Sequence, residues 1–126
     1  MTAGALRILL VEDNELNRDM LSRRLQRRGY AVTVALDGIE GVEAAGREHP
    51  DVVLMDLDLP RLSGLDATRR LRGDPATAGL KIIALTAHAM SDDRMRALDA
   101  GCDAFQSKPI DFAALVATIE AVAGGG

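Results

Sequence analysis

The sequence predicts an α/β domain in which a parallel β-sheet carries helices on both faces. Short apolar runs alternate with longer segments of helical pattern five times along the chain, and repeated strand–helix units build this doubly wound architecture. Four of the runs are rich in Val, Ile and Leu without polar alternation, which is typical of parallel strands buried on both faces. Right-handed crossovers should join the units.

Each apolar run is expected to form one strand of this sheet. The fifth run is short and weakly apolar, and it reads as an edge strand. The predicted strands are Leu6–Val11, Ala31–Ala35, Asp51–Met55, Lys81–Leu85 and Asp103–Gln106.

Five helices are expected between and after the strands, and capping residues mark most of their ends. Ser, Asn and Asp are favoured at helix starts, and Gly is favoured after helix ends. The expected helices run from Asn14 to Arg28 before Gly29, from Asp37-Gly38 to about Arg47, over Leu65–Arg72 with Ser63 as a cap, from Ser91 to Gly101, and from Asp111 through the helically spaced Leu115, Val116, Ile119 and Val122.

Length and composition restrict the function classes. The 126 residues fit a single domain, 1–126, with a core over about 6–123 and a flexible glycine tail at 124–126. Hydrophobic residues make up 48% and aromatic residues 2%, so the core should be aliphatic. A net charge of −4 argues against nucleic-acid binding. The one cysteine, Cys102, and the absence of a long apolar N-terminal run lead us to expect a soluble cytoplasmic domain.

Polar side chains gather where the predicted strands end. In open α/β sheets, ligands bind outside the carboxyl ends of the strands. Singly, each of these residues could be a helix-end acid, a turn former or a surface residue, but their joint placement on one edge indicates a site. The residues are Glu12 and Asp13 after the first strand, Asp56 and Asp58 after the third, Thr86 after the fourth, and Lys108 after the fifth.

These acids require a counter-charge, because like charges about 4 Å apart repel by roughly 4 kcal/mol at an effective dielectric of ~20. Lys108 supplies one positive charge, which is not enough. Few carboxylates with room for water favour Mg²⁺, and no histidine or cysteine joins the cluster to suggest zinc; His49 and His88 lack liganding partners. A carboxylate beside Mg²⁺ can attack phosphorus and form an aspartyl phosphate.

Four stretches of the chain together resemble the receiver domains of two-component response regulators. They are ILLVEDNELNR, VVLMDLDLPRLSGLD, IIALTAHAM and AGCDAFQSKPI, and the resemblance extends from Arg7 to about Val122. It implies a flavodoxin-like (βα)5 fold with strand order 2-1-3-4-5. It also implies a signalling domain that promotes only its own phosphorylation and dephosphorylation. The last two stretches are commonest in stand-alone receivers and in those attached to hybrid kinases.

The resemblance assigns a role to each polar residue of the edge. Asp56 is the implied phosphoacceptor and Lys108 the lysine that contacts the phosphoryl group. Mg²⁺ would be held by Asp13 and Asp56, by the backbone carbonyl of Asp58, and by Glu12 through water. Thr86 and Phe105 are the implied switch pair, acting on the face formed by the fourth helix, fifth strand and fifth helix. The Lys108-Pro109 peptide bond is expected to be cis.

Two residues depart from the commonest family pattern, since Glu12 stands where many members have Asp and Phe105 where many have Tyr. Neither change disables the chemistry. In the family, the residues two positions beyond the acceptor and beyond the switch threonine influence phosphoryl lifetime. Here they are Asp58 and His88, and they leave that lifetime open.

The first predicted helix is the implied docking surface for a histidine kinase or a histidine phosphotransfer protein. The resemblance points to its exposed side near Asn17, Arg18 and Leu21. The basic run Arg23-Arg24-Leu25-Gln26-Arg27-Arg28 on the same helix is either part of that surface or a solvated face.

Two other functions remain open at this stage. The Asp56-Leu57-Asp58 stretch also resembles the DxD motif of haloacid-dehalogenase-type phosphatases, although the motif normally lies on the first strand and precedes a small turn rather than Leu59-Pro60. A pseudo-receiver that binds partners without phosphorylation is the second alternative, and the complete set of acids, threonine and lysine opposes it.

Overall fold

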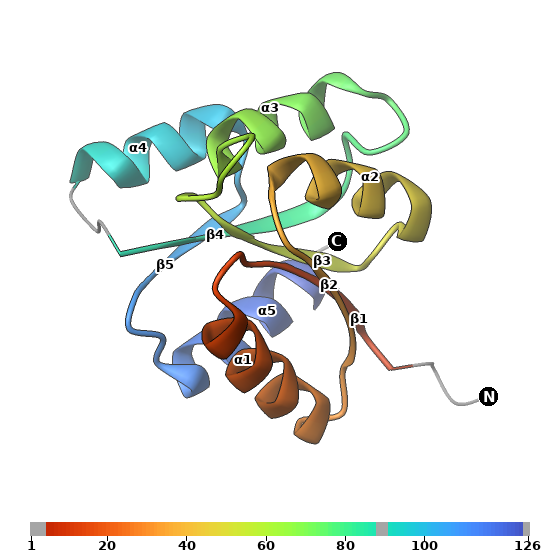
Figure 1. Ribbon diagram of the computed structural model, residues 1–126, viewed down its shortest axis with the longest axis vertical. Coiled ribbons are helices and arrows are strands. Elements are labelled where there is room, and N and C mark those ends of the chain that lie inside the picture. The colour runs from red at the N-terminus through yellow and green to blue at the C-terminus, as the bar shows by residue number, and fades with distance from the viewer. Residues whose placement is uncertain (1–4, 88–90, 125–126) are drawn as a thin grey trace.

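The fold is a five-stranded parallel sheet with helices on both faces, as predicted (Figure 1). The computed structural model describes residues 5–87 and 91–124, so His88, two positions beyond Thr86, lies outside the described residues. The strand order is β2-β1-β3-β4-β5, the predicted 2-1-3-4-5 arrangement. The strands are β1 (Arg7–Val11), β2 (Ala31–Ala35), β3 (Val52–Asp56), β4 (Lys81–Thr86) and β5 (Ala104–Ser107).

Five helices follow the strands, and their boundaries agree with the predicted caps. The side chains of Asn14, Asp37 and Ser63 each accept a hydrogen bond from a backbone N–H three residues later, which satisfies a donor that the first turn leaves open. The helices are α1 (Glu15–Arg27), α2 (Gly38–Glu48), α3 (Gly64–Gly73), α4 (Ser91–Ala100) and α5 (Phe112–Gly124).

The sheet separates two aliphatic cores, with α1 and α5 on one face and α2, α3 and α4 on the other (Figure 1). Alternate residues of a strand point to opposite faces. In β1, accordingly, Ile8 and Leu10 belong to the core under α1 and α5, whereas Leu9 and Val11 belong to the other core. The three central strands β1, β3 and β4 are buried almost throughout, which makes the sheet a rigid support for its ends.

The structure corrects some details of the prediction. β2 is apolar in sequence but is not buried on both faces, because it is an edge strand paired only with β1; Thr33 and Val34 are exposed. Strands β3 and β5 each begin and end one residue later than expected, β1 begins one residue later, and β4 ends one residue later. Asp56 and Thr86 therefore lie within their strands. Helix α5 ends at Gly124, inside the predicted glycine tail. His49 is exposed and Cys102 is buried.

Candidate functional site

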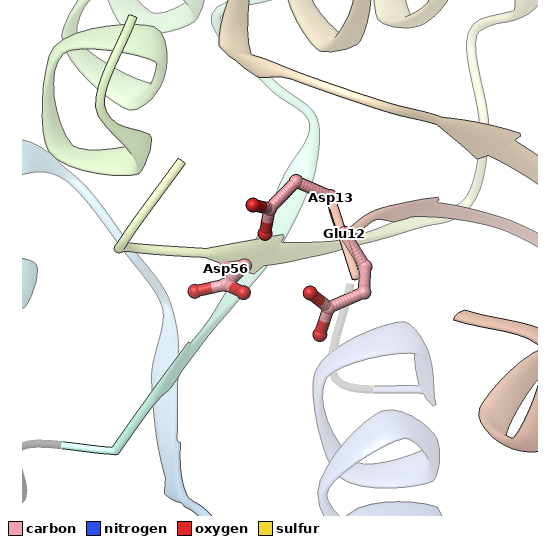
Figure 2. A group of neighbouring side chains, drawn as sticks. All are labelled: Glu12, Asp13 and Asp56. Carbon is pink, nitrogen blue, oxygen red and sulfur yellow. The ribbon is translucent and has the colours of Figure 1, made fainter. Parts of the chain in front are cut away.

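The acidic residues converge because the strands that carry them are neighbours. β1 and β3 pair with Val11 opposite Met55, so the residues that follow these two, Glu12 and Asp56, emerge at the same carboxyl edge. Glu12 and Asp56 are 3% and 2% exposed, whereas Asp13 is exposed. Figure 2 shows the three carboxylates facing a common space.

Lys108 reaches this space from the segment after β5. Its Nζ donates to Asp56 Oδ2 at 2.8 Å and to Glu12 Oε1 at 3.3 Å. Its backbone N–H donates to the carbonyl of Thr86 at 2.7 Å, which ties the segment to the end of β4. The Lys108-Pro109 peptide bond is cis, as the resemblance implied.

The electrostatics of the cluster follow from burial and from unequal charge. Burial raises the pKa of Glu12, and the nearby Asp56 raises it further, although the backbone N–H of Asn14 and the charge of Lys108 oppose this. Burial alone lowers the pKa of Lys108, but the hydrogen bond and charge of Asp56, together with Glu12, outweigh burial and raise it. The lysine is therefore held charged, while the acids still exceed it in number.

The carboxylates have the composition of a site for a hard divalent cation. Glu12, Asp13 and Asp56 each offer an oxygen, and these three atoms lie within 4.8 Å of one another. A site of oxygen ligands without nitrogen or sulfur suits Mg²⁺ or Ca²⁺ rather than zinc. The exposed Asp58 does not belong to this group, but its backbone N–H donates to Asp56 Oδ1 at 2.9 Å.

Thr86 and Phe105 lie on the adjoining strands. Thr86 is the last residue of β4 and is 2% exposed. Phe105 is half-buried in β5 and packs against the core under α2, α3 and α4. The guanidinium of Arg94, on α4, lies 5.7 Å from the Phe105 ring centroid. The predicted switch pair therefore sits between the carboxylates and α4.

A groove runs from Glu12 and Lys108 along α1, and we call it the α1 groove. It has a volume of about 480 Å³ and an apolar floor that includes Leu21, Leu85 and Ile110. Two of the predicted docking residues, Asn17 and Leu21, line it. The full lining is Glu12, Asn17, Met20, Leu21, Arg24, Leu85, Ala87, Lys108, Pro109 and Ile110.

The third predicted docking residue, Arg18, has a different environment. Its guanidinium donates to the backbone carbonyls of Glu12 and Asp13 at 3.1 and 3.3 Å, so it braces the acidic loop. Sequence reasoning missed Leu16 and Met20, which are 67% and 53% exposed on α1. Because residues four apart lie on the same face of a helix, their spacing could have predicted an exposed apolar pair on α1.

The arginines at the end of α1 are exposed, as expected both for a docking surface and for a solvated face. Arg24 stacks on Phe112 with 4.5 Å between its Cζ and the ring centroid. Arg28 pairs with Glu120 at 3.2 Å, with both side chains at least half exposed. Such exposed pairs contribute little stability.

Comparison with known proteins identifies the family. The model of the response regulator receiver domain matches residues 8–120. The chain belongs to the receiver domain family. Receiver domains act in two-component and phosphorelay signalling, and the match covers every residue of the carboxylate cluster, Thr86 and Lys108.

Relatives of known structure or function agree with this assignment. The polar-differentiation response regulator DivK of Brucella ovis is 38% identical over 117 residues, which are 93% of this chain and 95% of DivK. The receiver domain of the sensor histidine kinase PA1611 from Pseudomonas aeruginosa is 41% identical with a TM-score of 0.89, covering 97% of this chain and 99% of that domain. It was crystallised with a magnesium ion coordinated in its active-site cleft.

A third relative was crystallised with a partner. The receiver domain of Ssk1 from Saccharomyces cerevisiae, in complex with the histidine phosphotransfer protein Ypd1, is 28% identical with a TM-score of 0.87, covering 98% of this chain and 92% of that one. The family match does not favour the phosphatase alternative, which placed a general acid at Asp58. Within the described residues, no helix is long and apolar enough to cross a membrane.

Proposed function

We propose that Asp56 accepts a phosphoryl group from the phosphohistidine of a histidine kinase or a histidine phosphotransfer protein. The observation that carries the proposal is the environment of this carboxylate: it is 2% exposed, it lies 2.8 Å from the Lys108 ammonium, and it shares a space with two more acids. A buried carboxylate held beside a fixed cation is oriented for attack on phosphorus. Its place at the end of a rigid central strand limits its motion.

The donor set supports a magnesium ion in this space. Asp13 and Asp56 would be direct carboxylate ligands, Glu12 would act through water, and Asp58 would contribute its backbone carbonyl. Three carboxylate oxygens within 4.8 Å of one another fit a hard cation that keeps part of its water shell. When bound, Mg²⁺ neutralises negative charge on the phosphoryl oxygens.

The chain's own residues then perform the transfer. A carboxylate oxygen of Asp56 forms the new bond to phosphorus as the bond between phosphorus and the donor imidazole nitrogen breaks, and the imidazole keeps that electron pair. The Lys108 ammonium, already 2.8 Å from Asp56, stabilises one phosphoryl oxygen. The Thr86 hydroxyl moves to a second one, so each charged oxygen gains a fixed partner.

Movement of Thr86 would be the start of the switch. Phe105 follows it inward and leaves the contact with Arg94, which is 5.7 Å from its ring. This change alters the surface of α4, β5 and α5, where Met95 and Leu98 are 61% and 49% exposed. Phosphorylation thus favours one of two arrangements of that face and selects a downstream protein.

The α1 groove would receive the donor. It opens beside Lys108 and Glu12 and is bordered by Asn17, Leu21 and the exposed Met20, so an apolar helix of the donor could reach it while placing its histidine near Asp56. Arg18 contributes by bracing the acidic loop. The complex of Ypd1 with a similar receiver supports a donor of this kind, and the unpaired Cys102 fits a cytoplasmic setting.

Phosphorylation by a small molecule tests the proposal without any assumption about the partner. In Mg²⁺ and acetyl phosphate, mass spectrometry should show the gain of one phosphoryl group, and Asp56→Asn should abolish it. Asp58→Asn is the matched control, because it keeps the backbone carbonyl and should still be labelled. Labelling that survives in Asp56→Asn contradicts the proposal, and steady phosphate-ester turnover lost in Asp58→Asn would favour the phosphatase.

A further inference from the structure

An ion pair fastens the loop between β3 and α3 to the start of α2. Arg61 Nη1 lies 2.9 Å from Asp37 Oδ2. The other oxygen of Asp37 accepts the backbone N–H of Glu40 at 2.8 Å, which caps α2. The Asp37 side chain is only 10% exposed, so its charge lies largely away from water and gains from the guanidinium.

Arg61 adopts an unfavourable backbone conformation at this position. Its φ is +65°, in the left-handed region that costs residues with a Cβ free energy and that Gly and Asn tolerate best. A residue held in such a strained conformation next to a functional site is a candidate for a functional role of its side chain. Here the side chain makes one polar contact in the described structure, the pair with Asp37.

The backbone next to Arg61 also docks closely on α2. A Cβ built on Gly38, the first residue of α2, would lie 1.9 Å from the carbonyl oxygen of Leu62. Only glycine permits this approach. The ion pair and the glycine contact are separate observations, and both place residues 61–62 against the same helix end.

The other side of the loop is attached to the carboxylate cluster. The Asp58 N–H donates to Asp56 Oδ1 at 2.9 Å, and the Gly64 N–H donates to the carbonyl of Leu57 at 3.1 Å. A Cβ on Gly64 would lie 2.2 Å from the Asp56 carbonyl oxygen. Asp58 is therefore held between Asp56 on one side and the Arg61 contact on the other.

We propose that the Asp37–Arg61 ion pair is a latch that positions the Asp58 backbone for the metal ion. Arg61 and Asp37 act here as positioning residues, not as ligands. The inference rests on the proposed function, which makes the Asp58 carbonyl a magnesium ligand. Without the latch, residues 58–62 gain alternative conformations, and the ordered one must be restored each time the cation binds.

The latch should affect metal affinity far more than folding stability. Although the Asp37 side chain is only 10% exposed, the Arg61 side chain is 60% exposed, so solvent screens the pair and its contribution to stability is small. Replacing Arg61 by Asn also relieves the left-handed conformation. Residues that orient metal ligands, by contrast, typically change affinity by about 10–100-fold; since Arg61 acts through several bonds of backbone, we expect about a fivefold rise in the Mg²⁺ dissociation constant.

The experiment is a Mg²⁺ titration of the unphosphorylated protein, followed by backbone amide shifts of Asp13, Asp56 and Asp58 in NMR. Arg61→Asn and Asp37→Asn should both weaken binding about fivefold, while their urea midpoints without metal stay close to that of the wild type. Asp37→Asn keeps an oxygen for the α2 cap. Arg61→Lys, which preserves the positive charge, should recover most of the affinity.

Arg69→Ala is the matched control, because it removes the exposed Arg69–Asp66 pair on α3 without touching the loop, and it should bind Mg²⁺ like the wild type. Equal dissociation constants for Arg61→Asn and wild type overturn the latch. So does a loss of affinity that Arg61→Lys does not recover. A wild-type chain that shows no saturable Mg²⁺ shift contradicts the proposed metal site itself, which keeps the two failures distinct.

Discussion

The two edges of the sheet differ in how completely their charged side chains are paired. At the amino edge, the Arg72 guanidinium donates to the carbonyls of Gly101, Ala78 and Leu80 and to Asp103 Oδ2. Asp103 also accepts the N–H of Ile82 at the start of β4, at 2.7 Å. At the carboxyl edge, three carboxylates share a space with the single ammonium of Lys108.

This difference separates residues that stabilise the fold from residues that we propose to perform its chemistry. A charged group such as Arg72, which already makes four hydrogen bonds within the protein, has little left to offer a ligand. A cluster with surplus negative charge lowers the stability of the fold. A bound cation neutralises this charge, so the surplus that lowers stability also creates affinity for a cation. Clustered like charges are unfavourable for stability, and such locally unfavourable arrangements are expected where function requires them.

The largest expected effect comes from removing the counter-charge at the carboxyl edge. Lys108→Met leaves Glu12 and Asp56 buried without their ammonium, and breaking such a pair costs about 3–5 kcal/mol. Urea unfolding at neutral pH without metal should show this loss. Saturating Mg²⁺ should then raise the free energy of unfolding of the variant more than that of the wild type, because the cation replaces the missing charge. Equal stabilisation of both proteins would contradict the explanation that surplus negative charge at the carboxyl edge creates the affinity for Mg²⁺.

At the amino edge, the corresponding change should be smaller and independent of metal. Arg72→Met removes the guanidinium that joins α3 to the segment before β5. Because the side chains of Arg72 and Asp103 are 22% and 34% exposed, water can replace part of the lost contacts, and we expect a loss of about 1.5–3 kcal/mol, the range for one hydrogen bond to a charged group. Unfolding with and without Mg²⁺ should give the same loss. Arg69→Ala, at an exposed pair on the same helix, should stay within about 0.5 kcal/mol of wild type. If Mg²⁺ stabilised Arg72→Met more than wild type, this would contradict the claim that charges at the amino edge do not affect cation binding.

The carboxyl edge was predictable from sequence because parallel strands bring their ends together wherever they lie in the chain. A buried run followed by an acid was enough to place Glu12 and Asp56, and an apolar run followed by Lys-Pro was enough for Lys108. The order of the strands and the role of each residue came from the family resemblance.

Other features depend on contacts that no local pattern encodes. β2 reads as a buried strand, but its exposure follows from its place at the edge of the sheet. The bond from Arg18 to the acidic loop requires the turn of the chain before α1. The pair of Arg61 with Asp37 joins residues 24 positions apart, and nothing in the sequence signals that Arg61 has a positive φ.

The smallest predicted effect is a pH dependence confined to the carboxyl edge. Burial first, and then Asp56, raise the pKa of Glu12 above its unfolded value of 4.5. Between these two pKa values the folded state binds more protons than the unfolded state. The contribution of Glu12 to stability therefore falls as pH rises through this window, by at most about 1.4 kcal/mol per pH unit.

Glu12→Gln should remove this slope from a series of urea unfolding curves recorded without metal from the unfolded pKa upward. Glu12 accepts from the Asn14 N–H through Oε2 at 3.1 Å and from Lys108 through Oε1 at 3.3 Å. Glutamine keeps an oxygen for one of these two donors, so the variant loses one acceptor together with the charge. The lost acceptor changes stability at every pH, whereas the lost charge removes the slope. Arg72→Met is the control: its partner Asp103 lies at the other edge, and the slope should persist. An unchanged slope in Glu12→Gln would contradict this prediction. It would mean that another acid of the carboxyl edge, and not Glu12, binds the additional proton in the folded state.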